Sequence, residues 1–334
     1  MLTDIGAEQN DMVTGGAGYI GADCCKALSE AGYEPICYDN LSTGHAEFVR
    51  WGPLVIGDVQ DATKLANTFE THHGIIAVVH FAAISSVAES VRDPHEYYRN
   101  NLAGTIAVLH AMRSAGCLNL VFSSTGAVYG SADSKPIPES FSCLPINPYG
   151  SSKWMIERLL SDYRAAYGLS SFCLRYFNAS GADPSGLIGE RRDRETHLIP
   201  RALMTIQGQL PELEIYGDDY DTPDGTAIRD YIHVVDLAAA HVLALEKLLA
   251  GHPGGCLNLG TGTGFSVKQV VAALEKITGK PVPHTIRQRR PGDPAVLVAD
   301  PSLARAVLNF GPKHSEIETI ASTAWAWQQK VYPA

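Results

Sequence analysis

The feature that most restricts the fold of this chain is a glycine-rich turn, VTGGAGYIG, at residues 13–21. The residues before it suit a β-strand. The amphipathic segment Tyr19 to Ala31 follows, and Gly32 closes it in the manner of a helix C-terminus. A strand, a glycine turn and a helix in this order predict the opening unit of a dinucleotide-binding α/β fold.

The glycines satisfy the dinucleotide-binding pattern in two registers. Gly16, Gly18 and Gly21 give G-x-G-x-x-G, and Gly15 with the last two gives G-x-x-G-x-x-G. Such glycines let the backbone approach a pyrophosphate, and the helix N-terminus offers it free N–H groups and partial positive charge. A second strand ends in Asp39, at the expected distance of about 20 residues. A carboxylate there binds ribose hydroxyls and repels a 2′-phosphate, which favours NAD over NADP.

The run before the glycines fits this unit less well. Asn10 and Asp11 are polar residues placed where a central strand should begin. We therefore expect the first strand to be short or to start late.

The rest of the first half alternates short apolar runs with segments of helical length. Runs such as AVVHFAA, residues 77–83, do not alternate with polar residues, which suits strands buried on both faces of a parallel sheet. We predict an α/β fold with a Rossmann-type doubly wound parallel sheet, formed by residues 1–177 as an NAD-binding domain. From about Asn178 proline and glycine become frequent, so residues 178–334 are expected to form a smaller, loop-rich α/β lobe for substrate, some of whose elements return to the first domain.

Composition excludes several classes of function. The net charge of -10 argues against nucleic acid as a partner, and no apolar run approaches the ~18 residues of a membrane span. The seven cysteines lack a C-x-x-C spacing, and the polar N-terminus does not resemble a secretory signal, so we expect reduced thiols and a cytoplasmic protein. The twelve histidines show no metal-binding spacing, and we assign no metal.

A tyrosine and a lysine stand four residues apart in Tyr149-Gly-Ser-Ser-Lys153, just after Pro148, which is a favourable first residue for a helix. On a helix this spacing places both side chains on one face. An ammonium about 5 Å from a phenol, at an effective dielectric constant of about 20, favours the phenolate by about 3 kcal/mol. The pair therefore predicts a general base for a substrate hydroxyl, with further hydroxyls supplied by residues 123–125, which end a strand-like run.

These features resemble the extended short-chain dehydrogenase/reductase family, and within it the UDP-galactose 4-epimerases. The likeness runs from about Val13 to Asp300. Its motifs are TGGAGYIG (14–21), YDNLSTGH (38–45), GDV (57–59), HFAA (80–83), ESV (89–91), YYRNN (97–101), SSTGAVYG (123–130), NPYGSSK (147–153), LRYFNASGA (174–182), DGTAIRDYIHVVDLA (224–238), NLGTG (258–262) and RRPGD (289–293).

The resemblance implies an NAD-dependent isomerase that interconverts UDP-galactose and UDP-glucose by oxidation at C4, rotation of the keto sugar and re-reduction. Tyr149 would be base and then acid, Lys153 would tune it, and Ser124 with Thr125 would bind the O4 region. The cofactor-binding residues implied are Gly15, Gly18, Tyr19, Ile20, Gly21, Asp39, Asn40, Asp58, Val59, Phe81, Ala82, Ala83, Asn100, Ser123, Tyr149, Lys153, Tyr176 and Phe177.

The resemblance also implies a UDP-sugar site and a homodimer. The dimer would form through helices near residues 97–115 and 152–166. The substrate-binding residues implied are Thr125, Tyr149, Asn178, His197, Leu198, Glu214, Ile215, Tyr216, Arg229, Arg290 and Asp293. Arg229 and Arg290 would bind the diphosphate, and Asp293 the uridine ribose.

Several positions depart from the family pattern. Ala22-Asp23 replaces a frequent Ser-His and puts an acid near the start of the phosphate-binding helix, which would weaken cofactor contacts. Ser85 replaces a frequent lysine, whose role does not carry over. Leu297 stands where some members have tyrosine, and a smaller wall there would admit N-acetylated sugars.

Other readings stay open at this point. Gly126-Ala127 stands where related 4,6-dehydratases carry an acidic pair, which argues against dehydration. A UDP-N-acetylhexosamine 4-epimerase, a UDP-glucuronate 4-epimerase and a decarboxylase remain alternatives. A non-catalytic NAD-sensing protein would have no need of the Tyr149–Lys153 pair.

Overall fold

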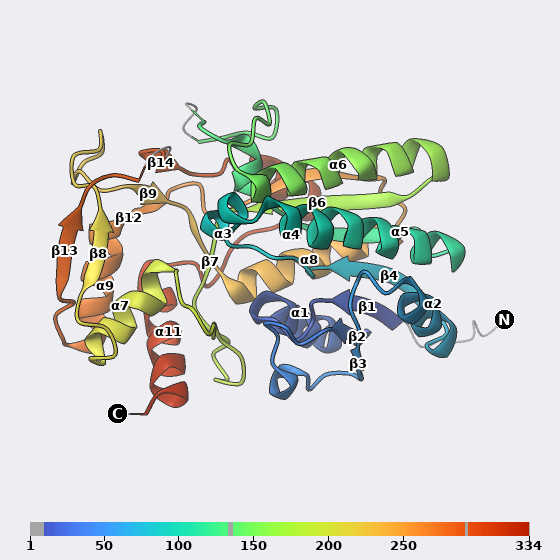
Figure 1. Cartoon of the computed structure of the whole chain (residues 1–334), viewed down its shortest axis with the longest axis horizontal. Helices are drawn as coiled ribbons and strands as arrows, with labels where there is room; N and C mark the ends of the chain where they lie inside the picture. The colour runs from blue at the N-terminus through green and yellow to red at the C-terminus, as the bar shows by residue number, and fades with distance from the viewer. Residues whose placement is uncertain (1–9, 133–135, 291–292, 334) are drawn as a thin grey trace. The chain divides into compact units, whose positions relative to one another are not determined.

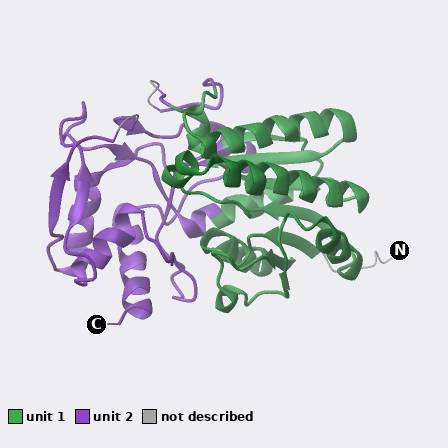
Figure 2. Cartoon of the chain, viewed as in Figure 1, with its two compact units in different colours: residues 1–130, 143–175, 238–257 green, residues 131–142, 176–237, 258–334 purple. Residues whose placement is uncertain are grey.

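The computed structural model describes residues 10–132, 136–290 and 293–333. The chain forms two compact units (Figure 2). The first comprises residues 1–130, 143–175 and 238–257, and the second comprises residues 131–142, 176–237 and 258–334. The sequence predicted a division at residue 177, with some later elements returning to the first domain. In the structure, segment 238–257 belongs to the first unit and segment 131–142 belongs to the second.

A seven-stranded sheet in the order β11-β6-β5-β4-β1-β2-β3 forms the centre of the first unit. The pairs from β5 through β3 are parallel, and helices pack against the sheet (Figure 1), as expected for a Rossmann-type fold. The strands are β1 (Asn10–Thr14), β2 (Glu34–Asp39), β3 (Leu54–Ile56), β4 (Ile75–His80), β5 (Asn119–Thr125), β6 (Ser170–Tyr176) and β11 (Gly254–Leu259).

The helices of the first unit include a series that packs side by side, from α2 and α5 through the π-helical turn η2 to α6. Buried side chains such as Met112, Phe122 and Ile156 fill the space between these helices and the sheet. The helical elements are α1 (Tyr19–Glu30), η1 (Ala46–Phe48), α2 (Ala62–Thr71), α3 (Val87–Arg92), α4 (Pro94–Tyr97), η2 (Tyr98–Ala103), α5 (Gly104–Ser114), η3 (Gly126–Tyr129), α6 (Pro148–Tyr167) and α8 (Val234–Leu249).

Strand β1 is short but does not start late, so the second alternative for this strand is wrong. It begins at Asn10, and all five of its residues are buried between β2 and β4. The side chain of Asn10 donates a hydrogen bond to the carbonyl oxygen of His73 at 2.8 Å, which satisfies one polar group. Asp11 is fully buried, and desolvation raises the pKa of its carboxyl to about 8. The strand therefore accepts a carboxyl group in its proton-bound form around neutral pH.

The second unit combines short sheets with helices. Strand β10 pairs with β7, β13 with β8, and β9 lies between β12 and β14. Helices α7, α9 and α11 pack around a core that includes Leu203, Leu274 and Ile320. The elements are β7 (Asn178–Ser180), α7 (Leu198–Ile206), β8 (Leu213–Tyr216), β9 (Ile228–Arg229), β10 (Tyr231–His233), β12 (Phe265–Ser266), α9 (Val267–Thr278), β13 (His284–Arg287), β14 (Val296–Leu297), α10 (Ser302–Leu308) and α11 (Ile317–Val331).

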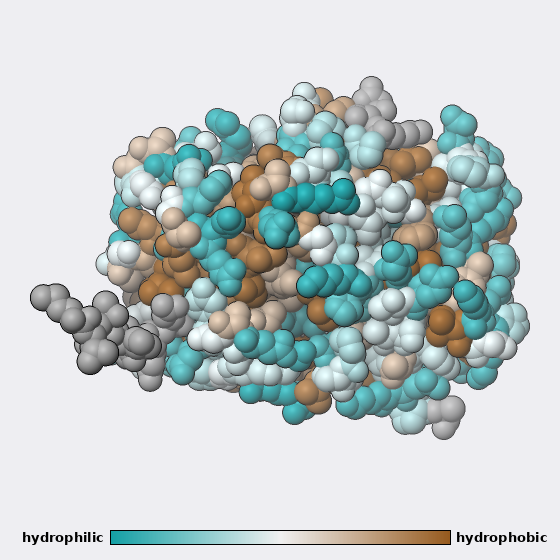
Figure 3. Space-filling model, turned by 180° about the vertical axis from the view of Figure 1, so that it is seen from behind, coloured by the Kyte–Doolittle hydropathy of each residue, from teal (hydrophilic) through white to brown (hydrophobic). Residues whose placement is uncertain are grey.

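The surface is mixed in character. On the face drawn in Figure 3, hydrophilic residues cover much of the area and hydrophobic residues gather in smaller groups among them. Within the described ranges, every helix is too short or too polar to span a bilayer.

Candidate active site

The glycine turn between β1 and α1 is shaped by backbone contacts that exclude side chains. Gly15 has φ +73°, and a Cβ there would lie 2.7 Å from the amide nitrogen of Ala82. A Cβ on Gly21 would lie 2.1 Å from the carbonyl oxygen of Gly15. A Cβ on Gly16 would lie 2.9 Å from the carbonyl oxygen of Val13, so the turn needs the first glycine of both patterns. Gly18 is the N-cap of α1 and has no side chain to cap it, and a helix N-terminus of this kind suits a phosphate.

The acidic residue of this helix is buried and lies beyond the first helical turn. Asp23 is the fifth residue of α1, its side chain is buried, and the first turn of the helix contains no acid. A carboxylate beyond the first turn has a weaker effect on the helix N-terminus, and the expected weakening of cofactor contacts stays a prediction.

Asp39 ends β2 and is held by the backbone. Its carboxylate accepts hydrogen bonds from the amide of Ala17 at 3.0 Å and the amide of Leu41 at 2.8 Å. Burial raises the pKa of Asp39, and these two hydrogen bonds act in the opposite direction. The next residue, Asn40, donates a hydrogen bond to Asp58 at 2.9 Å. A bare glycine turn, an uncapped helix N-terminus and a carboxylate at the end of the next strand fit the pyrophosphate and a ribose of a dinucleotide.

Helix α6 positions the tyrosine and the lysine. The side chain of Asn147 caps the helix through the amide of Gly150 at 2.8 Å, and proline follows at the first helical position. The ammonium of Lys153 donates to the carbonyl oxygen of Ser123 at 2.9 Å and lies 4.8 Å from the ring centre of Phe122. Desolvation lowers the pKa of the buried Lys153 to about 7. Tyr149 is half-buried, and its ring lies 6.5 Å from that of Tyr97 in an edge-on arrangement.

The end of β5 brings three buried hydroxyl residues, Ser123, Ser124 and Thr125, beside α6. Thr125 accepts a hydrogen bond from the amide of Ala127 at 3.1 Å. Ser124 donates to Glu157 at 2.5 Å. The structure thus confirms that the hydroxyl run ends a strand and lies against the helix of the Tyr149–Lys153 pair.

Two buried polar residues near this site were not predicted to have a role. Asn101 accepts from the amide of Ile84 at 2.8 Å and donates to Ser152 at 3.1 Å, which ties the loop after β4 to α6. His80 bridges Thr14 at 2.6 Å and Thr105 at 2.8 Å, and burial lowers its pKa to about 3. The motif YYRNN contained the only signal for Asn101, the motif LRYFNASGA contained Arg175, and Glu157 had no signal beyond its helical spacing from Lys153.

The second unit carries two groups of predicted substrate-binding residues. Arg229, on β9, forms an ion pair with Asp293 and donates to the carbonyl oxygen of Ile228 at 2.7 Å. On β8, the hydroxyl of Tyr216 donates to Glu214 at 2.7 Å, and the guanidinium of Arg290 lies 3.8 Å from the Tyr216 ring centre. Ile215, between the two β8 residues, is buried.

His197 and Leu198 stand at the start of α7. The imidazole of His197 lies 2.6 Å from a carboxylate oxygen of Glu190. The charge of Glu190 raises the pKa of this imidazole. The backbone N–H of Asn178, the first residue of β7, donates a hydrogen bond to the backbone carbonyl oxygen of Asp230 at 3.1 Å.

The predicted residues divide between the units. The first unit contains the catalytic and cofactor positions, apart from Tyr176 and Phe177, which group with the second unit and its substrate positions. Two residues of the RRPGD motif, Pro291 and Gly292, and the polar segment 1–9 lie outside the described residues.

Comparison with known proteins agrees with this architecture. The model of the NAD dependent epimerase/dehydratase family matches residues 12–260. A UDP-glucose 4-epimerase of Rhizobium meliloti (strain 1021) is 48% identical over 321 residues, which cover 96% of this chain and 97% of that protein.

Solved structures are similar over the same extent. A UDP-glucose 4-epimerase from Brucella ovis in complex with NAD has a TM-score of 0.93 and 52% identity, covering 95% of this chain and 98% of its own. A UDP-glucose-4-epimerase from Stenotrophomonas maltophila, with bound NAD and formylated UDP-arabinopyranose, has a TM-score of 0.94 and 42% identity, covering 97% and 98%. The chain belongs to the NAD dependent epimerase/dehydratase family.

Proposed function

We propose that this chain is an isomerase that interconverts UDP-galactose and UDP-glucose with NAD as its cofactor. The observation that carries the proposal is the Tyr149–Lys153 pair on α6, placed against the hydroxyl end of β5 in the unit that also holds the glycine turn. Near-full-length similarity to UDP-glucose 4-epimerases supports the choice of substrate.

The residues divide the chemistry as follows. The glycine turn and Asp39 would hold NAD, whose chemistry when bound would be to accept a hydride from C4 of the sugar and supply it again. Tyr149 removes the proton of the 4-hydroxyl and later gives it back, and the ammonium of Lys153 favours the phenolate that does so. Ser124 and Thr125 hold the oxygen on C4.

The second unit supplies recognition of the nucleotide. The guanidinium groups of Arg229 and Arg290 are suited to bind the diphosphate, and the carboxylate of Asp293 the uridine ribose. In the absence of substrate Asp293 pairs with Arg229, so we infer that the nucleotide exchanges this ion pair for its own contacts.

Conversion of UDP-galactose by the purified protein, read by coupled detection of UDP-glucose with no NAD added, tests this function. We expect turnover, because the glycine turn and Asp39 are formed for a retained dinucleotide. Activity that appears only with added NAD would keep the reaction but refute tight retention. Silence in both conditions, with turnover of UDP-glucuronate, would replace the proposed substrate.

We further propose that N-acetylated sugars are accepted. Leu297 lies on β14 opposite Arg229, partly buried, where it offers a smaller wall than tyrosine. UDP-N-acetylgalactosamine should be turned over, and Leu297→Tyr should lower its kcat/KM by about tenfold or more, since overpacking costs 1–3 kcal/mol. Both sugars are assayed with both proteins. Undetectable turnover of the N-acetylated sugar by the parent chain, beside good turnover of UDP-galactose, would refute the idea.

We propose that the protein acts as a cytoplasmic homodimer that associates through α5 and α6. Ile106 on α5 and Met155 on α6 are apolar and exposed, at 43% and 39% of their surface. Light scattering after size exclusion should give twice the chain mass. The double variant Ile106→Glu/Met155→Glu should be monomeric, whereas Leu303→Glu, at a similarly exposed position on α10, should remain dimeric. A monomeric parent protein at micromolar concentration would contradict the proposal.

A further inference from the structure

Helix α6 carries a third ionisable residue on the face of the Tyr149–Lys153 pair. Glu157 follows Lys153 by four residues, and helical spacing places the three side chains in one row. The Glu157 side chain is only 4% exposed. A buried carboxylate is costly unless it is paired and hydrogen-bonded, so its partners decide what it does.

Glu157 is fully engaged. One carboxylate oxygen accepts from Ser124 at 2.5 Å and from Nε of Arg175 at 2.9 Å. The other accepts from the terminal nitrogen of Arg175 at 2.5 Å, and the remaining nitrogen of Arg175 donates to Tyr129 at 2.8 Å. The guanidinium thus neutralises Glu157 through two parallel bonds. The carboxylate also accepts from a hydroxyl of the proposed active site, that of Ser124, and from the thiol of Cys256 at 3.7 Å.

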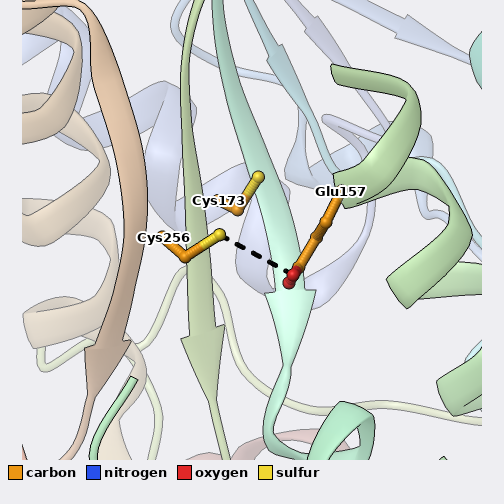
Figure 4. Close-up of side chains that lie close together, drawn as sticks. All are labelled: Glu157, Cys173 and Cys256. Atoms are coloured by element: carbon orange, nitrogen blue, oxygen red, sulfur yellow. Dashed lines mark hydrogen bonds between the residues drawn. The ribbon is translucent and has the colours of Figure 1, made fainter. Parts of the chain in front are cut away.

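The same carboxylate also lies near two thiols. Glu157 from α6, Cys173 from β6 and Cys256 from β11 lie close together (Figure 4), with their ligand atoms within 4.8 Å of one another. These residue types could bind a soft metal ion. Arg175, however, already occupies both carboxylate oxygens and brings a positive charge that opposes a cation. The arrangement favours a role for Glu157 as a hydrogen-bond acceptor.

The contact with Ser124 has a direct consequence for the neighbouring strand. Lys153 donates to the carbonyl oxygen of Ser123, and one turn later Glu157 accepts from the hydroxyl of Ser124. Successive turns of α6 therefore hold successive residues of β5. In the absence of substrate, the proton of Ser124 is directed to Glu157.

We propose that Glu157 is a positioning residue of the active site, which fixes the Ser124 hydroxyl and the end of β5 against the face of α6 that carries Tyr149 and Lys153. This inference rests on the proposed function of those residues. Arg175 serves it by neutralising the carboxylate, so that the hydrogen bond to Ser124 persists in the interior.

The electrostatics add a second effect. Desolvation lowers the pKa of Lys153, and the charge of Glu157 acts in the opposite direction. Removal of Glu157 should therefore make Lys153 lose its proton at lower pH, and the phenolate of Tyr149 would lose the support of the ammonium.

The test uses Glu157→Gln/Arg175→Gln, which removes both charges and leaves amides that can hydrogen-bond to each other. In the full-length protein, the titration of the Lys153 Nζ is followed by nitrogen NMR, with Lys153→Met for assignment. We expect it to move to lower pH by half a unit or more. For UDP-galactose, kcat should fall about tenfold or more with a KM change below about twofold, the signature of an interaction used in the transition state.

The control is Glu96→Gln/Arg99→Gln, which removes an exposed ion pair between α4 and η2 and should change neither readout. Ser124→Ala leaves the Glu157–Arg175 pair intact, so it tests the hydroxyl even if the first variant fails to fold. It should reproduce the loss of kcat without moving the Lys153 titration. A wild-type kcat for Ser124→Ala, or an unmoved titration and kcat in the folded double variant, would overturn the inference. If the parent chain does not convert UDP-galactose, the proposed function fails, and the NMR comparison still decides whether Glu157 supports Lys153.

Discussion

Tyr149→Phe should reduce the turnover of UDP-galactose about a thousandfold or more while leaving the protein folded and the cofactor bound. General acid–base catalysis by a positioned side chain contributes 10²–10⁴-fold. The phenol here serves in both directions of proton transfer, so we expect the upper part of that range. Phenylalanine keeps the ring that packs edge-on against Tyr97. The backbone bonds of α6 and the contact of Lys153 with Ser123 do not involve the lost hydroxyl.

The measurement compares kcat/KM, the amount of NAD that copurifies and the melting temperature in parent and variant. Tyr167→Phe, at the exposed end of the same helix, is the matched control and should leave turnover unchanged. Activity within tenfold of the parent would rule out Tyr149 as the base. Loss of both activity and NAD would instead indicate that the hydroxyl of Tyr149 helps to hold the cofactor.

The elements nearest the active site were predictable because their signals are local. Gly15 is favoured by its own positive φ, and the start of α6 is encoded by Asn147 and Pro148. Asp39 was found through its fixed distance along the chain from the glycines. In each case the sequence segment that carries the signal also makes the structure.

The Glu157–Arg175 pair could not be predicted in the same way. Its members come from α6 and β6, and its third partner, Ser124, comes from β5. Helical spacing put Glu157 on the face of Lys153, but nothing in the sequence indicates which strand lies opposite. Contacts of this kind depend on strand order, which is a property of the whole sheet.

Strand β1 shows the opposite error, since a local pattern was misleading. Its polar beginning suggested a late start, yet Asn10 and Asp11 both pair with β2 and β4 in the sheet. Burial there is imposed by the two neighbouring strands and not by the hydropathy of the residues themselves. No described residue donates a hydrogen bond to either oxygen of Asp11. Its stability cost is therefore uncompensated.

Asp11→Asn should stabilise the protein at neutral pH and remove part of its pH dependence. The folded-state pKa of Asp11 is about 8, against an ordinary value of 3.8, because burial disfavours the charged form. Below pH ~4 both states bind the proton, and Asp11 adds no penalty. As the pH rises toward 8, the unfolded chain releases this proton while the folded chain keeps it, so stability falls by about 1.4 kcal/mol per pH unit. Above pH 8 the folded state releases it too, and the loss levels off.

At pH 7 this penalty is on the order of 4 kcal/mol, which is large beside a typical net stability of 5–15 kcal/mol. Asparagine has nearly the same shape and no charge to release, so the variant keeps the buried polar group and loses only the titration. Urea unfolding at pH 5 and pH 8 should show a gain from Asp11→Asn that grows with pH, whereas Asp162→Asn, exposed on α6, should show none. A gain equal at both pH values would mean that Asp11 is charged in the folded protein or that its strand opens to water. Either explanation would contradict a buried carboxyl that keeps its proton. The gain in stability depends on pH only when the folded state holds this proton and the unfolded state does not.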